Sequence, residues 1–176
     1  HLDRIQSLRD GLRPAPVHVQ LVLSDLCNAD CSFCSYRMSN GLSNELFPEG
    51  KRKNPNRMIA SDKAREIIDD CATLGVKGLQ FTGGGEPTMH PEHLEMFARA
   101  QGHGISTALV TNGVNVDPTK PAVRAMSWVR VSVDSGTPKM YASTRRVSEK
   151  HWHRAWENIS ALAESCTGIV SVGFVI

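Results

Sequence analysis

The sequence predicts an α/β fold with a parallel sheet. Five short runs of β-branched and other apolar residues alternate with segments of helical periodicity, and no hairpin dipeptide joins two of these runs. Strands that are connected through helices pair in parallel by right-handed crossovers. At 176 residues, the chain has the length of one domain with one hydrophobic core. We therefore expect residues 1–176 to form a single α/β domain.

The first half of the chain supplies two of these strands and one helix. A strand is predicted over residues 17–25. From Ser61, which we expect to cap a helix, apolar residues recur on one helical face until Gly75. This face includes Cys71, so we place Cys71 in the core. The next strand is predicted over Leu79–Thr82, directly before three glycines.

The second half continues the alternation. In chain order we expect a helix from Pro91 to Gly102, a strand over Ser106–Val110, a short helix over Ala122–Met126, a strand over Trp128–Val133, a helix that contains Trp152 and Trp156 and closes near Cys166, and a strand over Ile169–Ile176. The tryptophan stripe is assigned to the core. In parallel sheets of this kind, ligands bind beyond the carboxyl ends of the strands, where the loops meet.

Composition excludes several function classes. Twenty Lys and Arg residues against 18 Asp and Glu residues give a formal net charge of +2, which is too balanced for binding nucleic acid or an anionic membrane through bulk charge. No apolar run is long enough to span a membrane, and the first residues lack the apolar core of a signal peptide. We expect a soluble, cytoplasmic protein. Because the chain begins with His1 and not with Met, we expect it to be a piece of a longer protein.

Three of the five cysteines, Cys27, Cys31 and Cys34, form a CxxxCxxC pattern directly after the first strand. Without a secretion signal, clustered thiols indicate metal ligands in a reducing compartment. Three thiolates leave one iron of a 4Fe-4S cluster open to another ligand, as in catalytic metal sites. A structural zinc site is the alternative. It would need a fourth ligand, whereas Cys71 and Cys166 lie on predicted helices.

A second motif, Gly83-Gly84-Gly85-Glu86-Pro87, follows the second strand. It lacks the Lys-Ser/Thr pair of a nucleotide phosphate loop. Pro87 restricts Glu86 to extended conformations, and the glycines allow a ligand to approach the backbone. An acceptor-rich strand end of this kind suits an ammonium group. The alternative interpretation is a plain glycine turn.

Residues 27–34 read CNADCSFC, with Phe33 directly before the third cysteine, and they resemble the signature of the radical S-adenosylmethionine (SAM) enzymes. The elements that follow match this family in order, from about residue 17 to residue 176. The resemblance implies a partial parallel (β/α) barrel in which about five of six strands are present, a loop insertion at 37–58, and truncation at the C-terminal end. That insertion is either a mobile cover over the cluster or a solvated surface loop.

The resemblance also implies a 4Fe-4S cluster on Cys27, Cys31 and Cys34. In this family, the cluster reductively cleaves SAM to a 5′-deoxyadenosyl radical, which abstracts hydrogen from a substrate. Phe33 and its neighbours would flank the adenine of SAM. The Gly84-Gly85-Glu86 segment would hold its amino group.

Further SAM contacts are expected beyond the fourth strand. Ser132 and Asp134 would offer a hydroxyl and a carboxylate to the ribose, and Asp134 has the alternative role of a loop cap. Arg145 would pair with the SAM carboxylate, because a guanidinium fork matches a planar carboxylate. Arg146 competes with it for this role, and an ordinary surface arginine is the alternative for Arg145. The turn at 111–113 is either a family feature or a generic Asn-Gly turn.

The partners implied are SAM and an external one-electron donor of the flavodoxin or ferredoxin type. The substrate is unknown, and the resemblance favours modification of a peptide or protein. A cofactor-biosynthetic or nucleoside substrate fits equally well. A non-catalytic iron-sulfur or zinc protein is the alternative from another class, and it leaves Glu86 and the glycines without a role.

Overall fold

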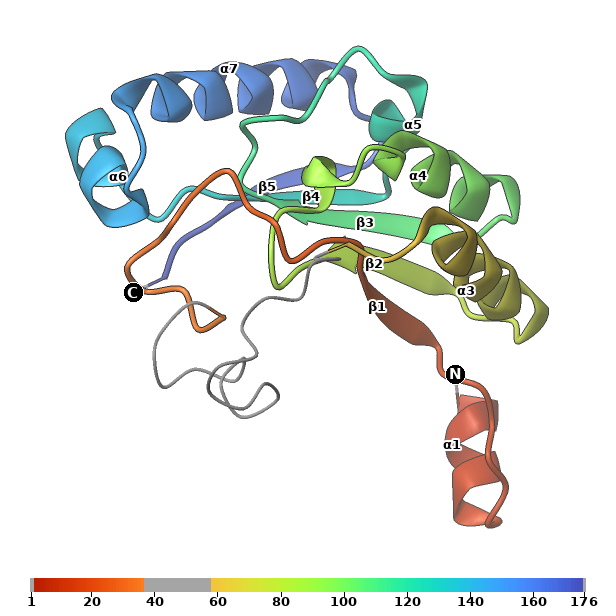
Figure 1. The fold of residues 1–176 in the computed structure, drawn as a ribbon. Helices are drawn as coiled ribbons and strands as arrows, with labels where there is room; N and C mark the ends of the chain where they lie inside the picture. The colour runs from red at the N-terminus through yellow and green to blue at the C-terminus, as the bar shows by residue number, and fades with distance from the viewer. Residues whose placement is uncertain (1, 37–57, 176) are drawn as a thin grey trace.

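The computed structural model describes residues 2–36 and 58–175 (Figure 1). Its sheet has five strands: β1 (His18–Val22), β2 (Gly78–Thr82), β3 (Ser106–Thr111), β4 (Trp128–Ser132) and β5 (Ile169–Gly173). Neighbours in the sheet are also neighbours in the chain, and all four pairings are parallel. The predicted class and the number of strands are therefore confirmed.

The helices connect these strands. They are α1 (Leu2–Arg9), α3 (Ser61–Thr73), the 3-10 turn η1 (Pro87–Met89), α4 (His93–Gly102), α5 (Pro121–Arg124), α6 (Pro138–Arg145) and α7 (Glu149–Ser165). In Figure 1, α3, α4, α5 and α7 lie along one side of the sheet, while α1 projects away from the rest of the molecule. No helix in the described ranges is both long and apolar enough to cross a lipid bilayer.

The core lies between the sheet and these helices. Phe81 on β2 packs against Phe97 on α4 with ring centroids 4.6 Å apart, and both side chains are fully buried. Cys71 is buried as predicted. The tryptophan stripe on α7 is only half-buried: Trp156 packs against the core, but Trp152 does not belong to it and donates from Nε1 to the carbonyl of Ser135.

Several predicted boundaries were wrong. Ala60, and not Ser61, occupies the N-cap of α3, and Ser61 is the first helical residue. The helix expected to begin at Pro91 begins at His93, because Pro91 lies in the preceding turn. The last strand ends at Gly173 and does not continue to residue 176 as predicted.

The sequence prediction also missed α1 and α6. For α6 the local signals are present: Thr137 accepts a hydrogen bond from the Met140 amide, and Pro138 occupies the first turn. The apolar periodicity is weak, however, because Tyr141 and Arg145 are the buried residues of this helix. The loop insertion predicted at 37–58 lies outside the described residues except for Met58, which forms a single antiparallel bridge with Ser24.

Candidate active site

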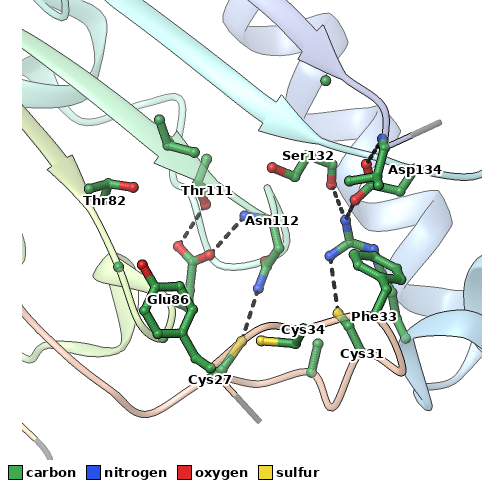
Figure 2. A pocket seen from close by; sticks show the side chains of 18 of the residues that line it. Cys27, Cys31, Phe33, Cys34, Thr82, Glu86, Thr111, Asn112, Ser132 and Asp134 are labelled. Atoms are coloured by element: carbon green, nitrogen blue, oxygen red, sulfur yellow. Dashed lines mark hydrogen bonds and ion pairs between the residues drawn. The ribbon is translucent and has the colours of Figure 1, made fainter. Parts of the chain in front are cut away.

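A cavity of about 480 Å³ opens at the carboxyl ends of the strands (Figure 2). It is lined by all ten residues that the sequence assigned to the cluster or to SAM: Cys27, Cys31, Phe33, Cys34, Gly84, Gly85, Glu86, Ser132, Asp134 and Arg145. Figure 2 shows Glu86 at one side of the cavity and Asp134 at the other. The loop that carries Cys27, Cys31 and Cys34, the cysteine loop, runs between the two sides. The parallel topology explains this gathering, because each loop follows the carboxyl end of its strand.

The cysteine loop is held between α6 and the loop of Gly83, Gly84 and Gly85, the glycine loop. The Glu86 amide donates to the carbonyl of Leu26 at 2.8 Å on one side. On the other side, the amides of Asp30 and Ser32 donate to the carbonyls of Arg145 and Thr144 at 3.0 and 2.8 Å. These carbonyls lie at the end of α6, where the helix leaves its own acceptors unpaired. The helix that the sequence prediction missed therefore positions the cysteines.

The three cysteines are half-buried and form no disulfide. Asn112 Nδ2 lies 3.9 Å from Cys27 Sγ, and Arg145 Nη1 lies 3.8 Å from Cys31 Sγ. Burial raises the pKa of the Cys31 thiol, and the positive charge of Arg145 opposes this rise. Because metals bind the thiolate form, a cation at this position favours a ligated Cys31.

The donor set fits an iron-sulfur cluster better than a single metal ion. Over 2–36 and 58–175, no three His, Cys, Asp or Glu side chains are arranged to hold one metal ion. An iron-sulfur cluster takes each thiolate on a different iron, so its ligands need not converge on one point.

Glu86 is buried, with 2% of its surface exposed. Its backbone is extended, as Pro87 predicts. Oε1 accepts from the hydroxyls of Thr111 and Thr88 at 2.6 and 2.8 Å, and Oε2 accepts from the Asn112 amide at 2.8 Å. None of the described Lys or Arg side chains forms an ion pair with it. Among the described residues, the Glu86 carboxyl group is thus held by neutral donors alone.

The glycines have a different structural reason from the one expected. A Cβ atom on Gly85 would lie 2.2 Å from the carbonyl oxygen of Leu26, and one on Gly84 would lie 2.8 Å from Asp25 Oδ1. The glycines therefore allow the cysteine loop to approach the glycine loop closely. Whether they also admit a ligand stays a prediction.

Arg145 is not a surface arginine, since 3% of its surface is exposed. Its Nη2 donates to Asp134 Oδ2 at 2.5 Å and to the Ser132 carbonyl at 2.7 Å. Its guanidinium lies 4.8 Å from the ring centroid of Tyr141 and 5.9 Å from that of Phe33. The Nε atom is buried and has no hydrogen-bond partner in the described structure. By contrast, the competing Arg146 is exposed and pairs with Asp30.

Asp134 has both carboxylate oxygens engaged within the chain. Oδ2 pairs with Arg145, and Oδ1 accepts from the Val175 amide at 2.8 Å. Its φ of 55° lies in the left-handed region that L-residues rarely adopt. These contacts fit the alternative role of a loop cap better than the role of a ribose acceptor. The side chain of Ser132 lines the cavity next to it.

Sequence reasoning did not identify Thr88 and Thr111 as partners of Glu86, or Tyr141 as a partner of Arg145. Thr111 is the last residue of β3 and Thr88 follows the loop after β2, and these positions are the only sequence signal for them. Tyr141 carries no signal without α6. Asn112 was noted only as part of a turn, although its side chain also reaches Cys27.

The model of the Radical SAM superfamily matches residues 21–176. The chain belongs to the radical SAM superfamily. A curated relative in this superfamily, the S-adenosylmethionine-dependent nucleotide dehydratase of Flammeovirga pacifica, is 29% identical over 119 residues, which cover 66% of this chain and 38% of the relative. The mycofactocin maturase MftC of Mycobacterium ulcerans is 29% identical over 161 residues, which cover 89% of this chain and 40% of MftC.

Radical SAM structures also share the fold. SuiB of Streptococcus suis, solved bound to precursor peptide SuiA, superposes with a TM-score of 0.71 at 15% identity, over 97% of this chain and 35% of SuiB. The same protein has been solved bound to S-adenosylmethionine. The cofactors of the superfamily are a 4Fe-4S cluster and SAM. The chain spans about two fifths of the length of the curated relatives named above. The predicted division of the protein into a core domain and further segments stays a prediction.

Proposed function

We propose that this chain is the core of a radical SAM enzyme, with the cluster on Cys27, Cys31 and Cys34 and with SAM across the strand ends. The observation that carries the proposal is the arrangement, around one cavity, of three cysteines that form no disulfide, a buried carboxylate and a buried guanidinium. Among the described residues, the carboxylate has no cation partner and the guanidinium Nε has no hydrogen-bond partner. Thiolates are the ligands that iron-sulfur clusters use.

The chemistry that the cluster supplies when bound is reductive cleavage of SAM to a 5′-deoxyadenosyl radical, which abstracts hydrogen from the substrate. The protein's own residues bind and orient SAM. Its ammonium group would lie toward Glu86, where a negative charge has no cation partner among the described residues. Its carboxylate would lie toward Arg145, where the Nε–H is free to donate. The two charges of SAM would thus be held from opposite sides of the cysteine loop.

The rest of SAM would contact the residues around Arg145. Phe33, whose ring faces the guanidinium, would flank the adenine. The Ser132 hydroxyl would meet the ribose. Asp134 would act mainly as a positioning residue, because its ion pair with Arg145 aims the guanidinium and its bond to Val175 holds the segment after β5. Gly84 and Gly85 would place the backbone of their loop beside the ammonium group.

The substrate class that we prefer is a peptide or protein. The structure of SuiB with a precursor peptide supports this choice by similarity of fold. A nucleotide substrate is the second candidate, supported by the nucleotide dehydratase among the relatives. The proposal also includes an external one-electron donor and a reducing, cytoplasmic location, which suits five cysteines that form no disulfide.

The test is anaerobic reconstitution of the chain with iron and sulfide. We expect about four irons per chain, as a 4Fe-4S cluster requires. With SAM and a chemical reductant, we expect 5′-deoxyadenosine, measured by chromatography and mass spectrometry. A preparation that binds zinc in place of iron, or an iron-loaded chain that leaves SAM intact, would overturn the proposal.

A further inference from the structure

Asn112, at the end of β3, connects the two anionic parts of the site. Its side chain is buried, with 6% of the residue exposed. Its backbone amide donates to Glu86 Oε2 at 2.8 Å, and its side-chain Nδ2 lies 3.9 Å from Cys27 Sγ. Figure 2 shows the residue between Glu86 and the cysteine loop, with dashed lines to both sides. One residue therefore donates to a buried carboxylate and to a cysteine sulfur.

The hydrogen bonds fix which end of the Asn112 side chain faces the sulfur. Oδ1 accepts from the Val114 amide at 3.0 Å. Only the oxygen of the Asn side chain can accept a hydrogen bond, since its nitrogen is a donor. Nδ2 must then point the other way, toward Cys27 and toward Asn28 Oδ1. The local turn thus holds a donor in place before any cofactor is bound, and the orientation is not an arbitrary choice between nitrogen and oxygen.

We propose that Asn112 is a positioning residue that donates to the Cys27 thiolate and thereby raises the reduction potential of the bound cluster. The inference rests on the proposed function, since it needs Cys27 to be a cluster ligand. Reduction adds negative charge to the cluster, and hydrogen bonds to its sulfurs stabilise that charge. Without this donor, less positive polarity would offset the negative charges of the Glu86 carboxylate and the Cys27 thiolate.

The three cysteines differ in this respect. Cys27 has the neutral donor Asn112, and Cys31 has the cationic donor Arg145. For Cys34, the described part of the chain provides no such side-chain donor within hydrogen-bonding reach. Arg145 is also assigned to SAM, so its removal would change two functions together. Asn112 contacts Glu86 through its backbone, so a change of its side chain keeps the bond to Glu86 and removes the donor to the Cys27 sulfur and to Asn28 Oδ1.

The test compares two variants of Asn112 with one control on the same loop. Asn112→Asp keeps an oxygen for the Val114 amide and replaces the donor by an anion. Asn112→Ala removes the donor without adding charge. Asn115→Asp adds the same charge on an exposed residue three positions away, whose side chain contacts Met89 and no cysteine. The cluster potential is measured by redox titration monitored by electron paramagnetic resonance (EPR), with iron content determined in parallel.

We expect Asn112→Asp to lower the reduced-to-oxidised ratio at a fixed potential about tenfold, which is about 59 mV for a one-electron couple. Asn112→Ala should shift the potential in the same direction by less, and Asn115→Asp should leave it at the wild-type value. Unchanged potentials in both Asn112 variants, or loss of iron from both, would overturn the inference. Absence of a cluster from the wild-type chain would instead overturn the proposed function.

Discussion

Two regions of this molecule carry clustered charges, which are exposed to solvent in one region and buried in the other. On the outer helices α3 and α4, Arg99 pairs with Asp69 at 2.6 Å, and both side chains are 36–40% exposed. At the strand ends, the side chains of Arg145 and Asp134 are only 4% and 6% exposed, and Glu86 is buried without a cation partner among the described residues. Exposed pairs gain little and cost little, whereas buried charges carry a large desolvation cost.

In the outer region, the charged side chains named here have partners of opposite charge within the protein. Arg65 is surrounded by Asp62, Glu92 and Glu95, and Asp69 also accepts from His103. In the inner region, Arg145 Nε has no partner and Glu86 has only neutral donors within the described chain. A carboxylate without a cation partner among the described residues, together with a guanidinium that has one unused donor, matches a ligand that carries an ammonium and a carboxylate. The comparison predicts that substitutions at the strand ends weaken binding of the cluster or of SAM, and that substitutions on the outer helices do not.

The largest effect is expected at the cysteines. Replacing Cys27, Cys31 or Cys34 by Ala removes one of three cluster ligands and should strip the iron. Cys71→Ala is the matched control, because this buried thiol lies in the core and does not line the cavity. Iron and sulfide analysis after reconstitution measures both. Iron retained in Cys31→Ala, or lost from a folded Cys71→Ala variant, would break the assignment.

The next effect is expected at Arg145. Arg145→Ala leaves the buried Asp134 carboxylate unpaired and should cost about 3–5 kcal/mol of stability, measured by denaturant unfolding. Arg145→Lys keeps a charge but loses the planar fork, so it should fold and bind SAM more weakly. Arg146→Lys is the control for the second variant, since Arg146 is exposed. Equal SAM affinity in the two lysine variants would show that Arg145 has only a structural role.

A smaller effect is expected for Glu86→Gln. This change removes the negative charge at nearly constant shape and should weaken SAM binding by about 1.5–3 kcal/mol, at least about tenfold in Kd, while the cluster spectrum survives. Glu95→Gln makes the same change on the outer face and should leave the Kd unchanged. Equilibrium dialysis with SAM checks both variants. An unaltered Kd in Glu86→Gln would reduce the motif to a glycine turn.

The smallest effect is expected at the outer pair. Arg99 and His103 lower the pKa of Asp69 to about 2, below its ordinary value of 3.8. The folded-state pKa is depressed, so the stabilisation is present above the ordinary pKa and is lost as the pH falls through about 2. Asp69→Asn should remove this acid-side dependence and leave iron content and SAM binding unchanged. Thermal unfolding between pH 5 and pH 2 measures it, and a loss of SAM binding would contradict the separation of the two regions.

Much of this site could be predicted because it depends on sequence-local features. The three cysteines, Glu86 and Arg145 follow strand ends or match motif spacings, and a parallel sheet brings strand ends together. Contacts between distant segments could not be predicted in the same way. The Asn112 contact to Cys27 and the Gly85 contact to Leu26 both depend on how two loops pack. α6 was missed because its buried face is narrow. The carbonyls at its end, which anchor the cysteine loop, were therefore missed as well.

The central claim is that the three cysteines and the two buried charges form a single site for the cluster and SAM. The most direct measurement is the EPR spectrum of the reduced cluster in the reconstituted chain, recorded with and without SAM. The account predicts that SAM changes the spectrum of the wild-type chain, because the ligand would occupy the iron that lacks a cysteine. A well-formed cluster whose spectrum is the same with and without saturating SAM would contradict it.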